Sequence, residues 1–321
     1  MRVLVTGGAG FIGSFVVERL LDRGESVVCI DDFNPFYDPA IKRHNLRTAM
    51  QNPRFTLVEA DICDNDALTQ VFDSGPFDVV VHLAARAGVR PSIDEPALYY
   101  RVNCEGTALL FEQCRRVGVK RITFASSSSV YGLNTKIPFS EADPVLHPIS
   151  PYAATKRAGE LLAFTYSHLY NMDISCLRFF TVYGPRQRPE MAIHRFIDKI
   201  EHGDSIVMFG DGSSARDYTY IDDIVDGIVG AVDHHQGYGI YNLGGLNPVL
   251  LRDLIKMVGS ATGKPVVVRN AAHQPGDVEI TCADTELAAQ NLHYHPRVSL
   301  QEGIRRMVEW YRTERYVPAV K

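Results

Sequence analysis

The sequence contains no long hydrophobic run. None of its segments reaches the roughly 18 apolar residues that a membrane-spanning helix needs. Met1 and Arg2 lead directly into the strand-like VLVTG, without the apolar stretch and cleavage site of a signal peptide. We therefore expect a cytoplasmic protein that spans no membrane. The formal net charge of -5 also argues against a general nucleic-acid binder.

Cysteine is scarce and follows no pattern. The six cysteines are scattered among apolar neighbours with no C-x-x-C pair, which indicates reduced core residues rather than a disulfide or zinc site. The 11 histidines include His234-His235 and His293-x-His295, but no carboxylate or cysteine stands at a familiar ligand spacing. We expect no metal site. Any phosphate must then be held by local arginines and backbone amides.

Short β-branched runs alternate with helical patterns along the chain. With 321 residues, 45% of them hydrophobic, the chain can bury a substantial core. The strand-like runs are RVLVT, SVVCI, RFTLVEA, DVVVHLA, RITFAS, ISCLRFF and, later, GIYNLGG. Helical spacing of apolar residues marks 11–23, 94–117 and 150–170 as crossover helices. The alternation predicts an α/β fold with a Rossmann-type, doubly wound parallel sheet.

The composition of the chain changes after residue 181. Glycine and proline become more frequent, and shorter helical patterns near 191–202, 250–261 and 299–313 are linked by loops. We predict a Rossmann domain over 1–180, to which 221–243 returns, and a smaller C-terminal substrate-binding lobe over most of 181–321. The sequence has no internal repeats or low-complexity segments.

The motif GGAGFIG follows the first strand and opens the first helix. Gly7, Gly10 and Gly13 allow a tight turn, close approach of backbone amides to a pyrophosphate, and packing of helix against strand. The next strand ends in Asp31-Asp32, where a carboxylate can accept hydrogen bonds from ribose hydroxyls and would repel a 2'-phosphate. The motif therefore predicts NAD binding, in preference to NADP. Asp61-Ile62 and HLAA at 82–85 fit the same nucleotide.

A second constellation combines SSSSVYG at 126–132 with Tyr152 and Lys156. Residues four apart on a helix share a face, so the lysine ammonium can lie near the phenol and favour phenolate. A free tyrosine has a pKa of about 10, and a nearby cation, reinforced by the positive nicotinamide ring, can bring it towards the pH at which it works as a general base. A serine at the end of the preceding strand can share the same substrate hydroxyl.

Taken together, GxxGxxG, the serine-rich strand end and YxxxK resemble the extended short-chain dehydrogenase/reductases, specifically the nucleotide-sugar epimerases, over essentially the whole chain. The resemblance places the catalytic set on Ser127, Tyr152 and Lys156, with Ser128 and Ser129 as alternatives to Ser127. It implies NAD as a retained cofactor and a homodimer formed through 94–117 and 150–170. The implied cofactor residues are Gly7, Gly10, Phe11, Ile12, Gly13, Asp31, Asp32, Asn34, Asp61, Ile62, Leu83, Ala84, Ala85, Asn103, Tyr152 and Lys156.

Several reactions occur among these enzymes. The 4,6-dehydratases carry an acidic residue or an Asp-Glu pair within the serine strand end, where this chain has serines, so a dehydratase is disfavoured. The resemblance implies an isomerase: the tyrosine takes the 4-hydroxyl proton, hydride passes from C4 to NAD, the 4-keto sugar turns over, and hydride returns to its other face. A UDP-glucose 4-epimerase, a UDP-glucuronate decarboxylase and a non-catalytic NAD-binding regulator remain alternatives.

The stretch RFFTVYGPRQRPEM at 178–191 separates these alternatives. Neutral-hexose 4-epimerases generally have asparagine at the place of Thr181 and arginine at the place of Gln274. RFFTVYGPRQRPEM and QPGDV instead resemble the UDP-glucuronate 4-epimerases, which implies that the loop holds a sugar carboxylate. An arginine fork suits that anion. The implied substrate residues are Arg90, Ser128, Ser129, Thr181, Arg186, Arg188, Met191, Ala192, Arg216 and Asp277.

Overall fold

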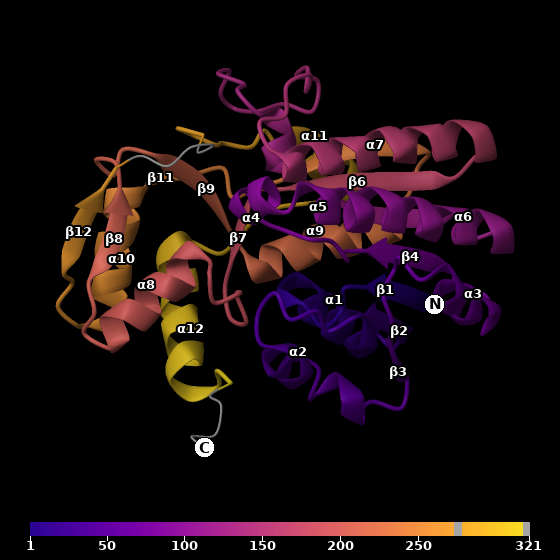
Figure 1. Cartoon of the computed structure of the whole chain (residues 1–321), viewed down its shortest axis with the longest axis horizontal. Coiled ribbons are helices and arrows are strands. Elements are labelled where there is room, and N and C mark those ends of the chain that lie inside the picture. Colours follow the sequence, from indigo (N-terminus) through magenta and orange to yellow (C-terminus); the bar gives the residue numbers. More distant parts are fainter. Residues whose placement is uncertain (273–277, 317–321) are drawn as a thin grey trace.

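The computed structural model describes residues 1–272 and 278–316. Its centre is a sheet of seven parallel strands in the order β10-β6-β5-β4-β1-β2-β3 (Figure 1). The strands are β1 (Arg2–Thr6), β2 (Ser26–Asp31), β3 (Phe55–Glu59), β4 (Val79–His82), β5 (Arg121–Ser127), β6 (Asp173–Phe179) and β10 (Tyr238–Leu243). The predicted Rossmann-type, doubly wound parallel sheet is confirmed.

Helices cover both faces of this sheet. One face carries α3 (Asn65–Asp73), α6 (Thr107–Val117) and α7 (Pro151–Tyr170), and the other carries α1 (Phe11–Asp22) and α9 (Ile221–Asp233). Strands β1 and β4 are buried on both faces, which explains why they read as continuous runs of valine and leucine rather than as alternating patterns.

The later part of the chain builds a smaller lobe beside the carboxyl ends of the strands, at the left of Figure 1. It has a three-stranded sheet, β11-β9-β7, and a two-stranded sheet, β12-β8. These elements are β7 (Thr181–Tyr183), α8 (Ala192–Glu201), β8 (Ile206–Phe209), β9 (Ala215–Tyr220), β11 (Pro248–Leu250), α10 (Leu251–Thr262), β12 (Val268–Ala271) and α12 (Leu300–Thr313). Helix α11 (Glu286–Leu292) packs on α9 and β10. The predicted domain boundaries stay a prediction.

The helix predicted over 94–117 is interrupted. The chain forms α4 (Val89–Asp94), α5 (Pro96–Tyr100), a π-helical turn (Arg101–Gly106) and only then α6. Pro96 has no amide hydrogen and disfavours a helical residue before it, so a new helix begins there. The π turn contains Asn103, whose side chain hydrogen-bonds both the amide and the carbonyl of Arg86. Such turns are frequent at functional sites.

All six cysteines are free thiols. No helix among residues 1–272 and 278–316 is both long and apolar enough to cross a membrane. Within the same ranges, no three histidine, cysteine or acidic side chains are grouped so that they could hold a metal ion.

Candidate functional site

A glycine turn joins β1 to α1. Gly7 has a φ of +70°, in the left-handed region that favours glycine. A Cβ on Gly13 would lie 2.1 Å from the carbonyl oxygen of Gly7, so no larger residue fits there. Gly10 is the N-cap of α1 and brings no capping side chain to the first amides of the helix. This cradle fits the pyrophosphate of a dinucleotide such as NAD.

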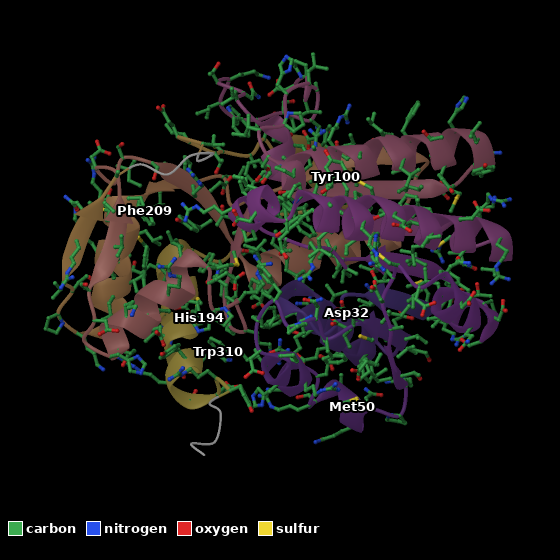
Figure 2. The ribbon with its side chains drawn as sticks, viewed as in Figure 1. Asp32, Met50, Tyr100, His194, Phe209 and Trp310 are labelled. Atoms are coloured by element: carbon green, nitrogen blue, oxygen red, sulfur yellow. The ribbon has the colours of Figure 1, made fainter. Side chains whose placement is uncertain are left out.

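Two carboxylates lie at the end of β2. The Asp31 carboxylate accepts hydrogen bonds from the amides of Ala9 at 3.1 Å and Phe33 at 2.9 Å, and from Lys42 Nζ at 3.1 Å. Asp32 is the more exposed of the two, with 39% of its side chain accessible (Figure 2). Lys42, on the short helix α2 (Pro39–Asn45), was not predicted from the sequence. It partly neutralises both acids at the place where we expect the adenosine ribose.

One cavity of about 380 Å³ brings the predicted residues together. It runs along the carboxyl ends of β1 to β6, where ligands bind in open α/β sheets. Of the predicted cofactor residues, it is lined by Gly7, Gly10, Phe11, Ile12, Gly13, Asp31, Asp32, Asn34, Asp61, Ile62, Leu83, Ala84, Ala85, Tyr152 and Lys156. Of the remaining predicted residues, Ser127, Ser128, Ser129, Thr181, Arg188 and Met191 line it.

The end of β5 and the start of α7 meet in this cavity. Ser127 caps a single 3-10 turn (Ser128–Tyr131), where its hydroxyl accepts from the amide of Ser129 and donates to the hydroxyl of Ser129, both at 3.2 Å. Ser150 caps α7, so Tyr152 lies in the first turn of the helix and Lys156 one turn later. The Lys156 ammonium donates to the carbonyl of Ala125 at 2.7 Å. Strand and helix thus bring all three predicted catalytic side chains into one cavity.

The electrostatics of the tyrosine differ from the prediction. Burial raises the pKa of the Tyr152 phenol, whereas a hydrogen bond with Ser127 and the positive charge of Arg188 oppose that rise. Burial also lowers the pKa of the Lys156 ammonium to about 8. The expected lowering of the phenol pKa by Lys156 is therefore wrong for this arrangement, because burial outweighs the nearby charges and the ammonium hydrogen-bonds the Ala125 carbonyl.

A buried ion-pair network lies behind the catalytic residues. Glu160, one turn after Lys156 and fully buried, accepts from Ser126 Oγ at 2.6 Å and from Arg178 Nε at 2.8 Å. Arg178 is 1% exposed, and its guanidinium carbon lies 4.8 Å from the centre of the Tyr131 ring. The network ties α7 to the ends of β5 and β6, and so fixes the spacing between the elements that carry the site.

The other end of the cavity is formed by the turn after β7. Thr181 begins β7, and Arg188 enters the cavity from the turn that follows. The Nε atom of Arg188 lies 2.9 Å from a carboxylate oxygen of Glu190, yet it is buried and has no hydrogen-bond partner within 1–272 and 278–316. The guanidinium thus lines the cavity beside Glu190, with which an anion in the cavity would compete.

Several predicted residues lie elsewhere. Arg186 does not line the cavity, because its guanidinium pairs with Glu18 on α1. Arg90 lies over the ring of Phe209 at 5.2 Å, and Arg216 donates to the carbonyl of Ala215 on β9. Asn103 supports the cavity wall through Arg86, and Ala192 begins α8 next to Met191; neither lines the cavity. The predicted Asp277, together with Gln274, lies outside the described residues.

The cavity also has lining residues that sequence reasoning missed. Besides Lys42 these include Phe36, Tyr37 and Arg86. Arg86 directly follows HLAA, so its place after a strand end could have indicated that it lines the cavity. Its Nη1 donates to Asn34 Oδ1 at 2.6 Å, which joins the ends of β2 and β4. Phe36 and Tyr37 lie in an irregular loop, where no periodicity indicates which side chains turn inward.

Comparisons with known proteins agree with this geometry. Over 96% of its length the chain is 43% identical to the UDP-glucuronate 4-epimerase of Thermodesulfobacterium geofontis, covering 95% of that protein. The crystal structure of UDP-glucuronic acid 4-epimerase from Bacillus cereus, in complex with UDP-glucuronic acid and NAD, matches with a TM-score of 0.91 at 36% identity, over 97% of this chain and 99% of that one.

The fold itself does not separate the reactions. A dTDP-glucose 4,6-dehydratase from Streptomyces venezuelae, with NAD bound, also matches with a TM-score of 0.91, at 32% identity and over 98% of both chains. The family described as "NAD dependent epimerase/dehydratase family" matches residues 3–244. These findings confirm the resemblance seen in the sequence. The chain belongs to the NAD dependent epimerase/dehydratase family.

Proposed function

We propose that the protein is a UDP-glucuronate 4-epimerase, an isomerase that interconverts UDP-glucuronate and UDP-galacturonate with NAD as cofactor. The carrying observation is that a single cavity is lined both by Ser127, Tyr152 and Lys156 and by Thr181 and Arg188. The first three suit oxidation at a sugar hydroxyl, and the last two suit a carboxylate. The activity named for the bacterial relative and for the Bacillus cereus structure supports the same substrate.

The chemistry of the chain's own residues follows from their places. Tyr152 accepts the proton of the sugar 4-hydroxyl, and Ser127, which already hydrogen-bonds the phenol, can hold the same oxygen. NAD, when bound, supplies the hydride acceptor for C4. Arg188 provides positive charge that counters the effect of burial on the phenol, and Lys156 holds the Ala125 carbonyl near the end of β5. The glycine cradle at Gly7–Gly13 and the acids after β2 would hold the pyrophosphate and the ribose of the cofactor.

The serines after β5 argue against a dehydratase. Elimination of water needs a further acid and base next to the sugar. Among residues 1–272 and 278–316, the carboxylates that line the cavity are those of Asp31, Asp32 and Asp61. Asp31 ends β2, and the other two follow β2 and β3, on the far side of β1 from β5. They lie at the cofactor end of the cavity. The place of these carboxylates, away from the serines of β5, therefore favours epimerisation over dehydration.

A uronic acid brings a chemical hazard once C4 is oxidised. The 4-ketone makes the sugar a β-keto acid, which loses carbon dioxide when its carboxylate bond aligns with the carbonyl π system. We propose that Thr181 and Arg188 hold the carboxylate by charge-assisted hydrogen bonds. Neutral carbon dioxide could not keep those bonds, so they oppose its escape as well as recognising the acid.

Product analysis tests this function. Purified protein is incubated with UDP-glucuronate, and the nucleotide sugars are resolved by chromatography and mass spectrometry. We expect UDP-galacturonate to form without added cofactor, because each cycle returns the hydride. A UDP-pentose product would assign a decarboxylase, and accumulating NADH would assign a dehydrogenase. Turnover of UDP-glucose alone would point to a neutral-hexose epimerase, and bound NAD with no turnover would point to a regulator.

We also propose that the protein acts as a homodimer in the cytoplasm. Leu161, Phe164 and Leu169 on α7 are 53%, 54% and 58% exposed, and Tyr100 and Val117 on the neighbouring helices are 48% and 37% exposed. These side chains offer a second copy an apolar surface. Sedimentation should give a dimer for the wild type and a monomer for Phe164→Glu. A monomeric wild type would contradict the dimer.

A further inference from the structure

The two arginines of the turn after β7 have different partners. Arg188 lines the cavity, whereas Arg186 reaches α1 on the other side of the turn. Arg186 Nη2 donates to Glu18 Oε1 at 3.0 Å, and its Nη1 donates to Ser14 Oγ at 3.2 Å. Its guanidinium carbon also lies 4.6 Å from the centre of the Phe15 ring. Three contacts, with Ser14, Phe15 and Glu18, therefore bind this side chain to the first two turns of α1.

The inner side of the same turn is held independently. Gln187 is 2% exposed, and its Nε2 donates to the carbonyl of Val182 on β7 at 3.0 Å. Its Oε1 accepts from the amide of His194 at 3.1 Å. His194 packs edge-on against Trp310 of α12 with ring centres 5.6 Å apart, and Figure 2 shows the two side by side. Arg188 thus comes directly after Gln187, which is fixed to the lobe, and Arg186, which is fixed to α1.

The backbone at Arg186 is unfavourable without its side-chain contacts. Its φ is +62°, a left-handed conformation that is unfavourable for a residue with a Cβ. Glycine or asparagine would fit the backbone better. The side chains of Arg186 and Glu18 are 13% and 22% exposed, so water screens their ion pair only in part. The ion pair and the ring contact offset the backbone strain, and simultaneous donation to Glu18 and Ser14 suits the two nitrogens of a guanidinium.

Helix α1 connects this contact to the cofactor end of the cavity. Its first turn supplies Phe11, Ile12 and Gly13 to the cavity wall. The Ser14 hydroxyl that accepts from Arg186 also donates to the carbonyl of Phe11 at 3.1 Å. A continuous set of hydrogen bonds therefore joins the cavity wall at α1 to the turn that carries Arg188.

We propose that Arg186 is a positioning residue, which fixes the turn at 184–191 to Glu18 of α1 so that Arg188 is held towards the sugar carboxylate. The proposal rests on the proposed function, in which Arg188 binds that carboxylate. Arg186 itself touches no substrate. Its side chain instead links the cofactor-binding helix to substrate recognition, which gives a reason for two arginines at alternate positions of one turn.

The test uses Arg186→Gln, Glu18→Gln and the double variant in the full-length protein. Hydrogen exchange measures the protection of the 184–191 backbone, and calorimetry measures the dissociation constants of UDP-glucuronate and UDP-glucose. Each single variant should expose the turn to exchange and weaken UDP-glucuronate binding by about three- to tenfold. UDP-glucose binding should stay within about twofold, because it has no carboxylate. The double variant should be no worse than either single variant.

Two further variants separate positioning from a general loss of structure. Arg19→Gln removes an ion pair from the same helix, that with Asp226 on α9, and should change neither exchange of the turn nor either affinity. Exchanging the charges, with Glu18→Arg and Arg186→Glu together, should restore part of the lost affinity. Equal weakening of both ligands, or additive losses in the double variant, would overturn the positioning role.

The outcome is separable from that of the proposed function. A wild-type protein that binds UDP-glucuronate but forms no UDP-galacturonate would overturn the epimerase, whereas exchange of the turn and the two affinities would still decide the role of Arg186. Conversely, an active wild type whose turn exchanges at the same rate in Arg186→Gln would retain the epimerase and refute the link to α1.

Discussion

Replacing Arg188 with alanine tests how the sugar acid is recognised. The Arg188 side chain is 20% exposed, and its buried Nε has no hydrogen-bond partner within 1–272 and 278–316. A charge-assisted hydrogen bond to a carboxylate is worth roughly 1.5–3 kcal/mol, about ten- to a hundredfold in affinity. The nearby Glu190 is 42% exposed, so its competing attraction is screened and reduces this gain only modestly. We expect Arg188→Ala to lower kcat/KM for UDP-glucuronate by about ten- to fiftyfold.

The assay compares an acidic with a neutral ligand. Steady-state kinetics with UDP-glucuronate are paired with calorimetry of UDP-glucose binding, which should change by less than about twofold. Arg188→Lys keeps the charge without the planar fork and should fall between the wild type and alanine. Arg195→Ala, an exposed arginine on α8 outside the cavity, controls for net charge.

Two results would refute parts of this reasoning. Equal losses for the acidic and the neutral ligand would show that Arg188 does not bind the carboxylate. Mass spectrometry addresses the protective role separately, because Arg188→Ala should release a decarboxylated 4-keto-pentose product. Epimerisation by that variant without a decarboxylated product would show that Arg188 does not protect the intermediate from decarboxylation. Its role in recognising the carboxylate would be unaffected by that result.

Three more perturbations follow from the site. Burial lowers the pKa of Lys156 to about 8, so the ammonium loses its charge above that pH and turnover should fall there. Lys156→Arg keeps its charge, so the alkaline limb of the pH–rate profile should shift to higher pH. Gly13→Ala should purify without NAD, measured as nucleotide released on denaturation, because its Cβ would meet the Gly7 carbonyl. Glu160→Gln should lower the free energy of unfolding in urea by about 3–5 kcal/mol, because Arg178 keeps a buried charge without its partner.

The same measurements can contradict the reasoning. An alkaline limb that stays in place in Lys156→Arg would assign it to another group. NAD retained by Gly13→Ala would show that the turn tolerates a side chain. Glu112→Gln breaks an exposed ion pair with Arg115 and keeps an oxygen that can accept from the Tyr166 hydroxyl, so it should cost far less than Glu160→Gln. An equal loss there would discount the buried network.

The cofactor end of the site could be predicted because its residues stand next to strand ends. Gly7 and Asp31 directly follow or end buried strands, and parallel strands bring their carboxyl ends to one edge. Lys42 could not be found in this way. It belongs to a short helix after an irregular loop, and only tertiary packing brings its ammonium to Asp31.

The sequence also could not distinguish the two arginines of the turn. Residues two apart in a loop have no fixed relation, and the side on which each lies depends here on the positive φ of Arg186. It depends as well on Glu18, which is 168 residues away along the chain. The π turn at 101–106 was missed for a related reason, because helical spacing of apolar residues continues across it.

The pairing of β10 with β6 makes the cofactor sheet depend on a segment that comes late in the chain. All of Tyr238–Leu243 pairs along β6, so the cofactor sheet gains its last strand only after the chain has left it to form β7, α8, β8 and β9 of the lobe. On the ribosome, β6 therefore stays an open edge while the intervening segment is synthesised. A fragment ending near residue 180 would expose that edge permanently, and exposed edges recruit strands from other chains. We therefore expect a fragment cut near residue 180 to aggregate rather than to fold as a stand-alone nucleotide-binding module.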